Sequence, residues 1–217
     1  GIPAAGAAAG EDRMTDALRL LYDAERVRLS GLSTQNNGDY LNPVFGEGPL
    51  MPQLMLIGEA PGREEAAAGH PFVGKAGRQL NELLELAGIA RGDVFVTNAV
   101  KFRPIKRGAR SVANRTPTAK ELASGEELLK SEIIAVRPRV IATLGNSPLA
   151  SMARISGVAA PKIGEAHGQA MNVNIGGNNI ALFPLYHPAS GIYNRELVET
   201  MRQDIVKLGQ YIKEGMA

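Results

Sequence analysis

Three polar side chains of different chemistry stand just past short apolar runs of the sequence. They are Glu59, Asn98 and His187. A carboxylate can orient a water molecule, and a carboxamide offers a hydrogen-bond donor and an acceptor on one side chain. A neutral imidazole is a donor that can stabilise negative charge on a leaving group, and its protonation state is tunable. Brought together by the fold, these groups would form a site for recognition and bond cleavage.

The elements that must position these groups are indicated by the apolar spacing. Short apolar runs predict strands at Gln53–Ile57, Val94–Thr97, Arg139–Leu144 and Ile180–Leu185. Helical spacing predicts helices over Glu11–Ser30, Lys75–Ala87, Thr118–Val136, Asn146–Ile155 and Arg195–Lys213. Thr118 and Glu121 have the spacing of a capping box at the start of one of these helices.

Strands that alternate with helices predict an α/β fold. We expect a three-layer α/β/α sandwich around a central, mainly parallel four-stranded sheet. In such sheets ligands bind outside the carboxyl ends of the strands, which is where Glu59, Asn98 and His187 stand. Residues 11–217 are expected to form a single domain, after a disordered tail at residues 1–10 that is rich in Ala and Gly.

The composition excludes several kinds of chemistry. The chain has 217 residues and no cysteine, which rules out disulfides, thiolate nucleophiles and cysteine-held metal or iron–sulfur sites. No clustered set of His, Asp and Glu indicates a metal site, so no cofactor is expected. No apolar run approaches the roughly 20 residues that a bilayer span needs, which fits a cytoplasmic protein.

One segment is strongly basic although the formal net charge of the chain is only +2. From Lys101 to Arg115 the sequence holds several Lys and Arg residues and no acidic residue. Such a block can neutralise nucleic-acid phosphates. Taken alone, a solvated basic loop is an equally good interpretation.

Four segments, in this order and spacing, resemble the uracil-DNA glycosylase superfamily. They are Gly58-Glu-Ala-Pro-Gly62, Pro71-Phe-Val-Gly74, Thr97-Asn-Ala-Val-Lys101 and Tyr186-His-Pro-Ala189. The pattern is most similar to the bacterial and archaeal group called family 4, and the resemblance extends from about Leu54 to Lys213. It implies a monofunctional enzyme of base excision repair that flips uracil out of DNA and hydrolyses its bond to the sugar.

The resemblance also implies roles for single residues. Phe72 would stack on the flipped base. Asn98 would pair with uracil O4 and N3–H, a pattern that cytosine reverses. Glu65 would block the methyl group of thymine, and His187 would donate to uracil O2 while the uracil leaves. Ala60 would contact uracil through its backbone amide, and Glu59 would orient a water or brace its loop.

The DNA itself would lie against two basic or polar segments. The residues expected to contact it are Lys101, Arg103, Arg107, Arg110, Ser190, Ile192, Tyr193 and Arg195. Ile192 or Tyr193 would fill the hole left by the flipped base. Uracil-containing DNA is therefore the expected partner, for a monomer located with the nucleoid in the cytoplasm.

The sequence departs from the family pattern at three places. Family 4 members resemble this chain but carry four cysteines around an iron–sulfur cluster, where Phe102 and Gly125 stand here and an N-terminal pair is missing. We expect side chains to pack the space instead. Asn114 stands where a covalently reacting relative has its histidine; an amide is a poor nucleophile, so turnover is expected. Ala60 stands where many superfamily members have Asp or Asn, as is usual in family 4, and a methyl group cannot act as a base.

Other functions stay open on the sequence alone. Ala60 and the missing cysteines also fit a catalytically weak or inactive DNA-binding relative, and the uracil pattern does not separate uracil from hypoxanthine or xanthine. A nucleotide-binding enzyme that uses Gly58–Gly62 as a phosphate loop is less well supported, because no Gly-x-x-x-x-Gly-Lys-[Ser/Thr] motif occurs.

Overall fold

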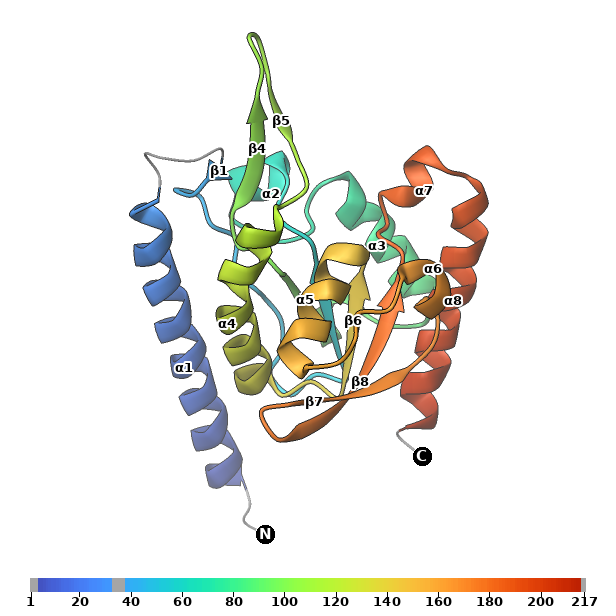
Figure 1. Cartoon of the computed structure of the whole chain (residues 1–217). Helices are drawn as coiled ribbons and strands as arrows, with labels where there is room; N and C mark the ends of the chain where they lie inside the picture. The colour runs from blue at the N-terminus through green and yellow to red at the C-terminus, as the bar shows by residue number, and fades with distance from the viewer. Residues whose placement is uncertain (1–3, 33–37, 216–217) are drawn as a thin grey trace.

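The computed structural model describes residues 4–32 and 38–215. Its centre is a five-stranded sheet in the order β3-β2-β6-β8-β7 (Figure 1). The strands are β2 (Leu54–Gly58), β3 (Val94–Asn98), β6 (Val140–Leu144), β7 (Met171–Ile175) and β8 (Asn178–Leu185). β2, β3, β6 and β8 are parallel, and β7 is antiparallel to β8. Parallel pairing brings the carboxyl ends of β2, β3, β6 and β8 to one edge of the sheet.

Helices cover both faces of this sheet, so the predicted three-layer α/β/α fold is confirmed. On one face pack α1 (Ala4–Ser30), α4 (Ala119–Val136) and α5 (Asn146–Ser156). On the other pack α3 (Lys75–Leu86) and α8 (Glu196–Glu214). The shorter helices are α2 (Arg63–Ala68), a 3-10 turn (Arg91–Asp93), α6 (Ile163–Ala166) and α7 (Ser190–Tyr193).

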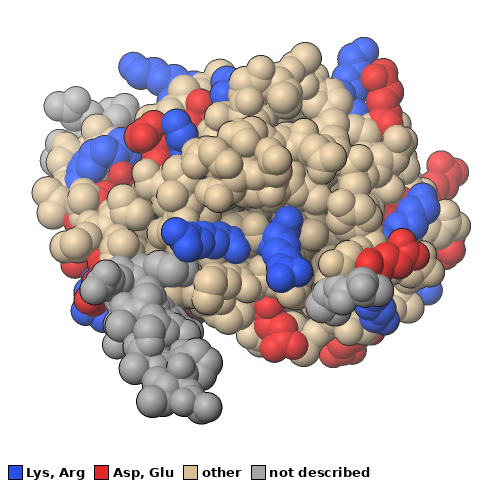
Figure 2. All heavy atoms as spheres, turned by 90° about the horizontal axis from the view of Figure 1, so that it is seen from below, with Lys and Arg blue, Asp and Glu red and all other residues tan. Residues whose placement is uncertain are grey.

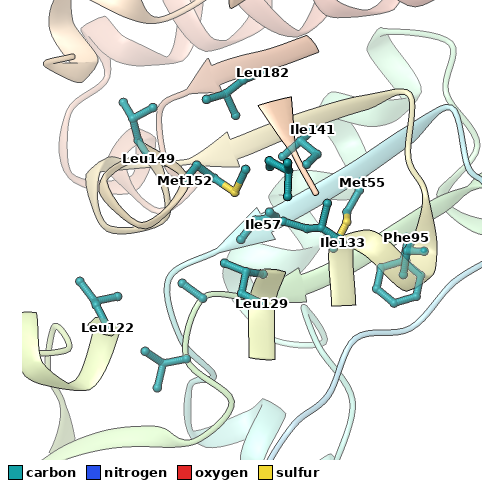
Figure 3. Packing of buried hydrophobic residues seen from close by; sticks show 14 of the residues in the cluster. Met55, Ile57, Phe95, Leu122, Leu129, Ile133, Ile141, Leu149, Met152 and Leu182 are labelled. Atoms are coloured by element: carbon teal, nitrogen blue, oxygen red, sulfur yellow. The ribbon is translucent and has the colours of Figure 1, made fainter. Parts of the chain in front are cut away.

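The layers adhere because alternate strand residues face opposite sides of the sheet. Met55 and Ile57 of β2 point toward α4 and α5, where they meet Ile133 and Met152 (Figure 3). Leu54 and Leu56 of the same strand pack instead with α3 and α8. All five residues of β2 are buried, as expected for a strand covered on both faces.

A second, small antiparallel sheet stands beside the carboxyl ends of the large one. It consists of β1 (Gly38–Asp39), β4 (Arg103–Arg107) and β5 (Val112–Asn114), in the order β1-β4-β5. β4 and β5 form a hairpin that rises above the body of the molecule (Figure 1). Most of the basic segment Lys101–Arg115, for which a solvated loop was one interpretation, is therefore a projecting β-hairpin.

Two expectations about the fold need correction. The central sheet has a fifth strand, β7, which adds an antiparallel edge through the hairpin turn at Gly176 and Gly177. Residues 4–10 belong to α1 and not to a disordered tail, while residues 1–3 of that predicted tail lie outside the described residues.

The capping box of Thr118 and Glu121 is confirmed by reciprocal hydrogen bonds of 3.2 and 2.7 Å. Within the part of the chain that the structure describes, no helix is long and apolar enough to span a bilayer.

Candidate active site

A cavity of about 680 Å³ opens at the carboxyl ends of the parallel strands. Its walls come from the loop after β2, the start of α3, the end of β3, the β4–β5 hairpin and the loop after β8. The predicted site residues that line it are Glu59, Ala60, Glu65, Phe72, Asn98, Arg103 and His187. The fold thus brings together side chains from four segments that are far apart in the sequence.

Asn98 is the last residue of β3 and only 4% exposed. Among the described residues no group hydrogen-bonds its carboxamide, and the residue lines the cavity. Buried polar groups are normally satisfied, so this carboxamide is available to a ligand. Gly58 leaves room for it, since a Cβ atom at that position would lie 2.4 Å from Asn98 Oδ1.

Phe72 faces the cavity from the loop before α3, in a backbone conformation that phenylalanine rarely adopts. Its φ angle is +57°, in the left-handed region that disfavours a Cβ atom. Gly77 of α3 permits this, because a Cβ there would lie 1.8 Å from the carbonyl oxygen of Phe72. The tip of the Phe72 ring lies beside Asn98: the Cβ that Gly58 lacks would be 2.6 Å from Phe72 Cζ. An aromatic wall and an unpaired carboxamide therefore adjoin the same point.

His187 lies in the loop that follows β8. The main-chain N–H of Ala189 donates a hydrogen bond of 3.1 Å to its Nδ1 atom. Burial lowers the pKa of His187 below its usual value, because an imidazolium would lose its hydration there. Among the described residues no group bonds Nε2, so that atom is left for a ligand in the cavity.

Glu59 follows β2 and also faces the cavity. Its Oε2 atom accepts a hydrogen bond of 2.5 Å from the hydroxyl of Ser147, in the first turn of α5. Ser147 was not among the residues predicted from the sequence. The signal was present, since Ser147 comes shortly after the third predicted strand and so obeys the same strand-end rule as Asn98.

Glu65 lines the cavity, and its two carboxylate oxygens hold the loops that form it. Oε2 accepts from the amide of Gly62 at 3.1 Å and Oε1 from the amide of Gly74 at 2.8 Å. The side chain therefore joins the loop after β2 to the loop that carries Phe72. Its predicted part in rejecting thymine stays a prediction.

The β4–β5 hairpin closes one side of the cavity. Nε of Arg103 on β4 donates 2.7 Å to Oδ1 of Asn114 on β5, and both residues line the cavity. Arg107 and Arg110, farther out along the hairpin, are exposed. Asn114, the position at which a relative has a reacting histidine, thus stands at the cavity wall.

The prediction made for Lys101 is wrong, because this residue is buried. Predicted to contact DNA, it is only 2% exposed, and its Nζ atom lies 2.6 Å from Oε2 of Glu132 inside the core. It cannot reach a phosphate on the outside of the molecule. The fold divides the basic segment Lys101–Arg115 into a buried lysine and an exposed hairpin.

The loop after His187 continues into α7 and the start of α8. Ser190 is half-buried and Arg195 exposed, and their predicted DNA contacts stay predictions. The predicted insertion of Ile192 or Tyr193 concerns side chains that lie outside the described part of the structure.

Phe102 and Gly125, the positions at which the resemblance implies missing cluster cysteines, are both closely packed. Phe102 is 3% exposed, and its ring centroid lies 4.4 Å from that of Tyr40. Gly125 of α4 lies so close to the chain that a Cβ there would be 2.7 Å from the carbonyl oxygen of Ala99. Around Phe102 the expected packing by side chains is confirmed. In the described residues no group of three or more His, Asp or Glu side chains is placed to hold a metal ion.

Known proteins are similar to this chain in sequence over most of its length. Residues 45–208 match the family model described as the uracil DNA glycosylase superfamily. The chain is 38% identical over 177 residues to the Type-4 uracil-DNA glycosylase of Saccharolobus solfataricus, which covers 81% of this chain and 77% of that protein. It is 37% identical over 175 residues to the Type-4 enzyme of Thermotoga maritima, 80% of this chain and 84% of that one.

A more distant relative is the Type-5 uracil-DNA glycosylase of Pyrobaculum aerophilum, 30% identical over 178 residues that cover 74% of this chain and 73% of that protein. The matched region contains all the strands and helices that build the cavity. The resemblance found in the four short motifs is therefore confirmed over most of the chain, which belongs to the uracil-DNA glycosylase superfamily.

Proposed function

We propose that this protein is a monofunctional uracil-DNA glycosylase that removes uracil from DNA in base excision repair. One observation carries the proposal. The carboxamide of Asn98 and the Nε2 atom of His187 face one cavity beside the ring of Phe72, and neither has a partner among the described residues. Family membership and relatives named as uracil-DNA glycosylases support it.

Recognition follows from the donor and acceptor of Asn98. The amide N–H donates to uracil O4, and the amide oxygen accepts from N3–H. Cytosine has an amino donor and a bare N3 at these positions, so it would leave buried polar groups unpaired, a cost of about 1–3 kcal/mol for each group. Stacking on Phe72 offsets part of the energy needed to take the base out of the helix, by roughly 1–3 kcal/mol.

Bond cleavage then requires stabilisation of the leaving group. The bond between uracil N1 and the sugar C1′ breaks, and uracil takes the electron pair as an anion while positive charge develops on the sugar. His187 donates from Nε2 to uracil O2 and so stabilises the anion. A water molecule adds its oxygen to C1′ and loses one proton. Transfer of a proton to the uracil anion balances this loss, so that the products are neutral uracil and an abasic sugar. Glu59, held by Ser147, orients this water.

The hairpin supplies the DNA side of the site. Arg103, Arg107 and Arg110 would hold phosphates as a flipped nucleotide enters the cavity. The opposite end of the sheet, seen from below in Figure 2, shows Lys and Arg scattered among Asp and Glu on a mainly uncharged surface. The proposal extends to action as a monomer, at the DNA of the cytoplasm and nucleoid.

The test is excision from a labelled oligonucleotide with one uracil, under excess enzyme, followed by alkali. We expect strand breaks at uracil only, and losses of about 100- to 1000-fold for His187→Ala, as for other removed anion-stabilising donors. Asn98→Ala should weaken excision as well. Absence of breaks in U·G, U·A and single-stranded substrates would refute the assignment. Hypoxanthine and xanthine substrates would then separate a glycosylase for deaminated purines from a DNA-binding protein.

A further inference from the structure

A buried ion pair lies directly behind the base-reading end of β3. Lys101 is 2% exposed and Glu132 is not exposed at all, and Lys101 Nζ lies 2.6 Å from Glu132 Oε2. Burying two charges costs about as much as their attraction returns, so a buried pair is weak evidence for stability. Its position suggests that this pair has another use.

The ammonium group of Lys101 has three acceptors. Besides Glu132 Oε2, it donates to the hydroxyl of Thr97 and, at 2.9 Å, to the main-chain carbonyl oxygen of Asn98. An ammonium group has three N–H donors, so this geometry uses all of them. Lys101 therefore makes a charge-assisted hydrogen bond to the main chain of Asn98, the residue whose carboxamide faces the cavity.

Glu132 is anchored in turn by two other elements. It accepts from the Thr97 hydroxyl at 3.0 and 3.1 Å and from the hydroxyl of Tyr22, on α1, at 2.5 Å. Burial and the neighbouring Glu132 raise the pKa of Tyr22 well above its usual value, so its hydroxyl keeps its proton and stays a donor. Helices α1 and α4 thus fix the lysine that fixes Asn98.

The next residues of the chain are held on the other side. The amide of Ala99 donates 2.8 Å to the carbonyl of Gly58, and the amide of Val100 donates 3.1 Å to the carbonyl of Glu59. The chain at Asn98 is therefore held on one side by the main-chain hydrogen bonds to Gly58 and Glu59, and on the other by the ammonium group of Lys101. The carboxamide of Asn98 has no partner among the described residues, so the direction in which it points depends on how this backbone is held.

We propose that Lys101 is a positioning residue for base recognition, which acts through the carbonyl oxygen of Asn98 and not through DNA. The inference rests on the proposed function. Misplacement of a binding group by about 1 Å can cost roughly 100-fold in rate. Because Lys101 holds the backbone of Asn98 before DNA binds, the carboxamide is already in position when the base enters the cavity.

The experiment compares wild type with the double variant Lys101→Met/Glu132→Gln, which leaves no unpaired buried charge. The measurements are the single-turnover rate of uracil excision, the melting temperature, and the affinities for abasic DNA and for free uracil. The matched control is Arg154→Met/Glu126→Gln, which removes an ion pair between α5 and the same helix α4 without contact to Asn98.

We expect the double variant to lose about 10- to 100-fold in rate and to bind free uracil more weakly, with unchanged affinity for abasic DNA. The control should keep the wild-type rate. Wild-type excision by the folded double variant would overturn the inference, and so would a parallel loss of affinity for abasic DNA. If wild type itself excises no uracil, the proposed function fails, which is a different result.

If the double variant does not fold, Thr97→Val keeps the ion pair and removes one acceptor of the ammonium group. We expect a rate loss of about threefold to tenfold, because part of the positioning is lost. A folded Thr97→Val with the wild-type rate and wild-type affinity for uracil would contradict the inference.

Discussion

The amide N–H of Ala189 donates to Nδ1 of His187 across 3.1 Å. Since a backbone amide is always a donor, Nδ1 must be the unprotonated nitrogen of the ring. The single proton of the neutral imidazole is therefore on Nε2, the atom that is left for the cavity. A hydrogen bond within the loop thus selects the tautomer that can donate to a substrate oxygen.

This arrangement predicts how excision depends on pH. Burial lowers the pKa of His187 below its ordinary value of about 6.5, so the neutral donor persists from neutral pH to below that value. Protonation at lower pH turns Nδ1 into a donor, which breaks the bond from Ala189, and the rate should fall. The same depressed pKa means that stability from neutral His187 is present above about pH 6.5 and is lost as pH falls through the folded pKa.

Single-turnover rates across the acid range test this prediction. The acid limb should have its midpoint below about 6.5, and His187→Asn should lose both the limb and most of the rate. A midpoint above that value would contradict the lowered pKa of His187, and a rate that rises as His187 gains a proton would contradict the assigned neutral tautomer.

A single methyl group at Gly58 should disable the site. In Gly58→Ala the new Cβ would lie 2.4 Å from Asn98 Oδ1 and 2.6 Å from Phe72 Cζ, so both side chains must move. We expect about a 100-fold loss of excision rate with the circular dichroism spectrum retained. Gly92→Ala is the control, because a Cβ there would meet nothing within 4 Å. Equal rates for the two variants would disprove the close approach at Gly58.

Removal of the aromatic wall should weaken capture of the flipped base. Phe72→Leu keeps a Cβ in the same backbone conformation and removes the ring, so we expect a loss of roughly 1–3 kcal/mol in transition-state stabilisation. The value is obtained from kcat/KM on a uracil oligonucleotide. Val73→Ala, in the same loop and 39% exposed, should have little effect. A similar loss in both variants would indicate a loop defect rather than the absence of stacking.

The hairpin arginines should contribute to DNA affinity without changing the chemical step. Arg107→Gln/Arg110→Gln removes two exposed charges, so the slope of log Kd against log salt should fall by about 0.7 to 0.9 for each phosphate that is no longer neutralised. The rate at saturating enzyme should be unchanged. Arg139→Gln/Lys213→Gln removes two exposed charges from the opposite end of the sheet and should leave the slope as it is. An unchanged slope in the hairpin variant would remove the hairpin from the DNA interface.

The hydroxyl of Ser147 should affect the excision rate through its hydrogen bond to Glu59. Ser147→Ala removes the 2.5 Å hydrogen bond that orients the carboxylate, so the excision rate should fall, though less than in Glu59→Ala. In the Glu59→Ala background the Ser147 change should have no further effect, because its partner is absent. Additive losses in that double-mutant cycle would show that Ser147 acts independently of Glu59.

The sequence by itself determined the layers of the fold and the edge of the sheet at which the site lies. Four apolar runs, each followed by a helical pattern, specify a parallel sheet covered on both faces, and parallel strands place their carboxyl ends at one edge. Glu59, Asn98 and His187 could be selected on that rule alone. The strand β7 could also have been found, since Met171, Val173 and Ile175 alternate with asparagines before two glycines.

Only the tertiary structure decided which charged residues face a ligand and which serve the core. Lys101 and Arg103 are two residues apart in one basic run, yet Lys101 turns inward to Glu132, 31 positions away, while Arg103 turns to the cavity. No local pattern encodes that choice, because the cost of burying a charge depends on a partner from a distant helix. The tautomer of His187 and the room that Gly58 leaves for Asn98 are likewise set by contacts across space.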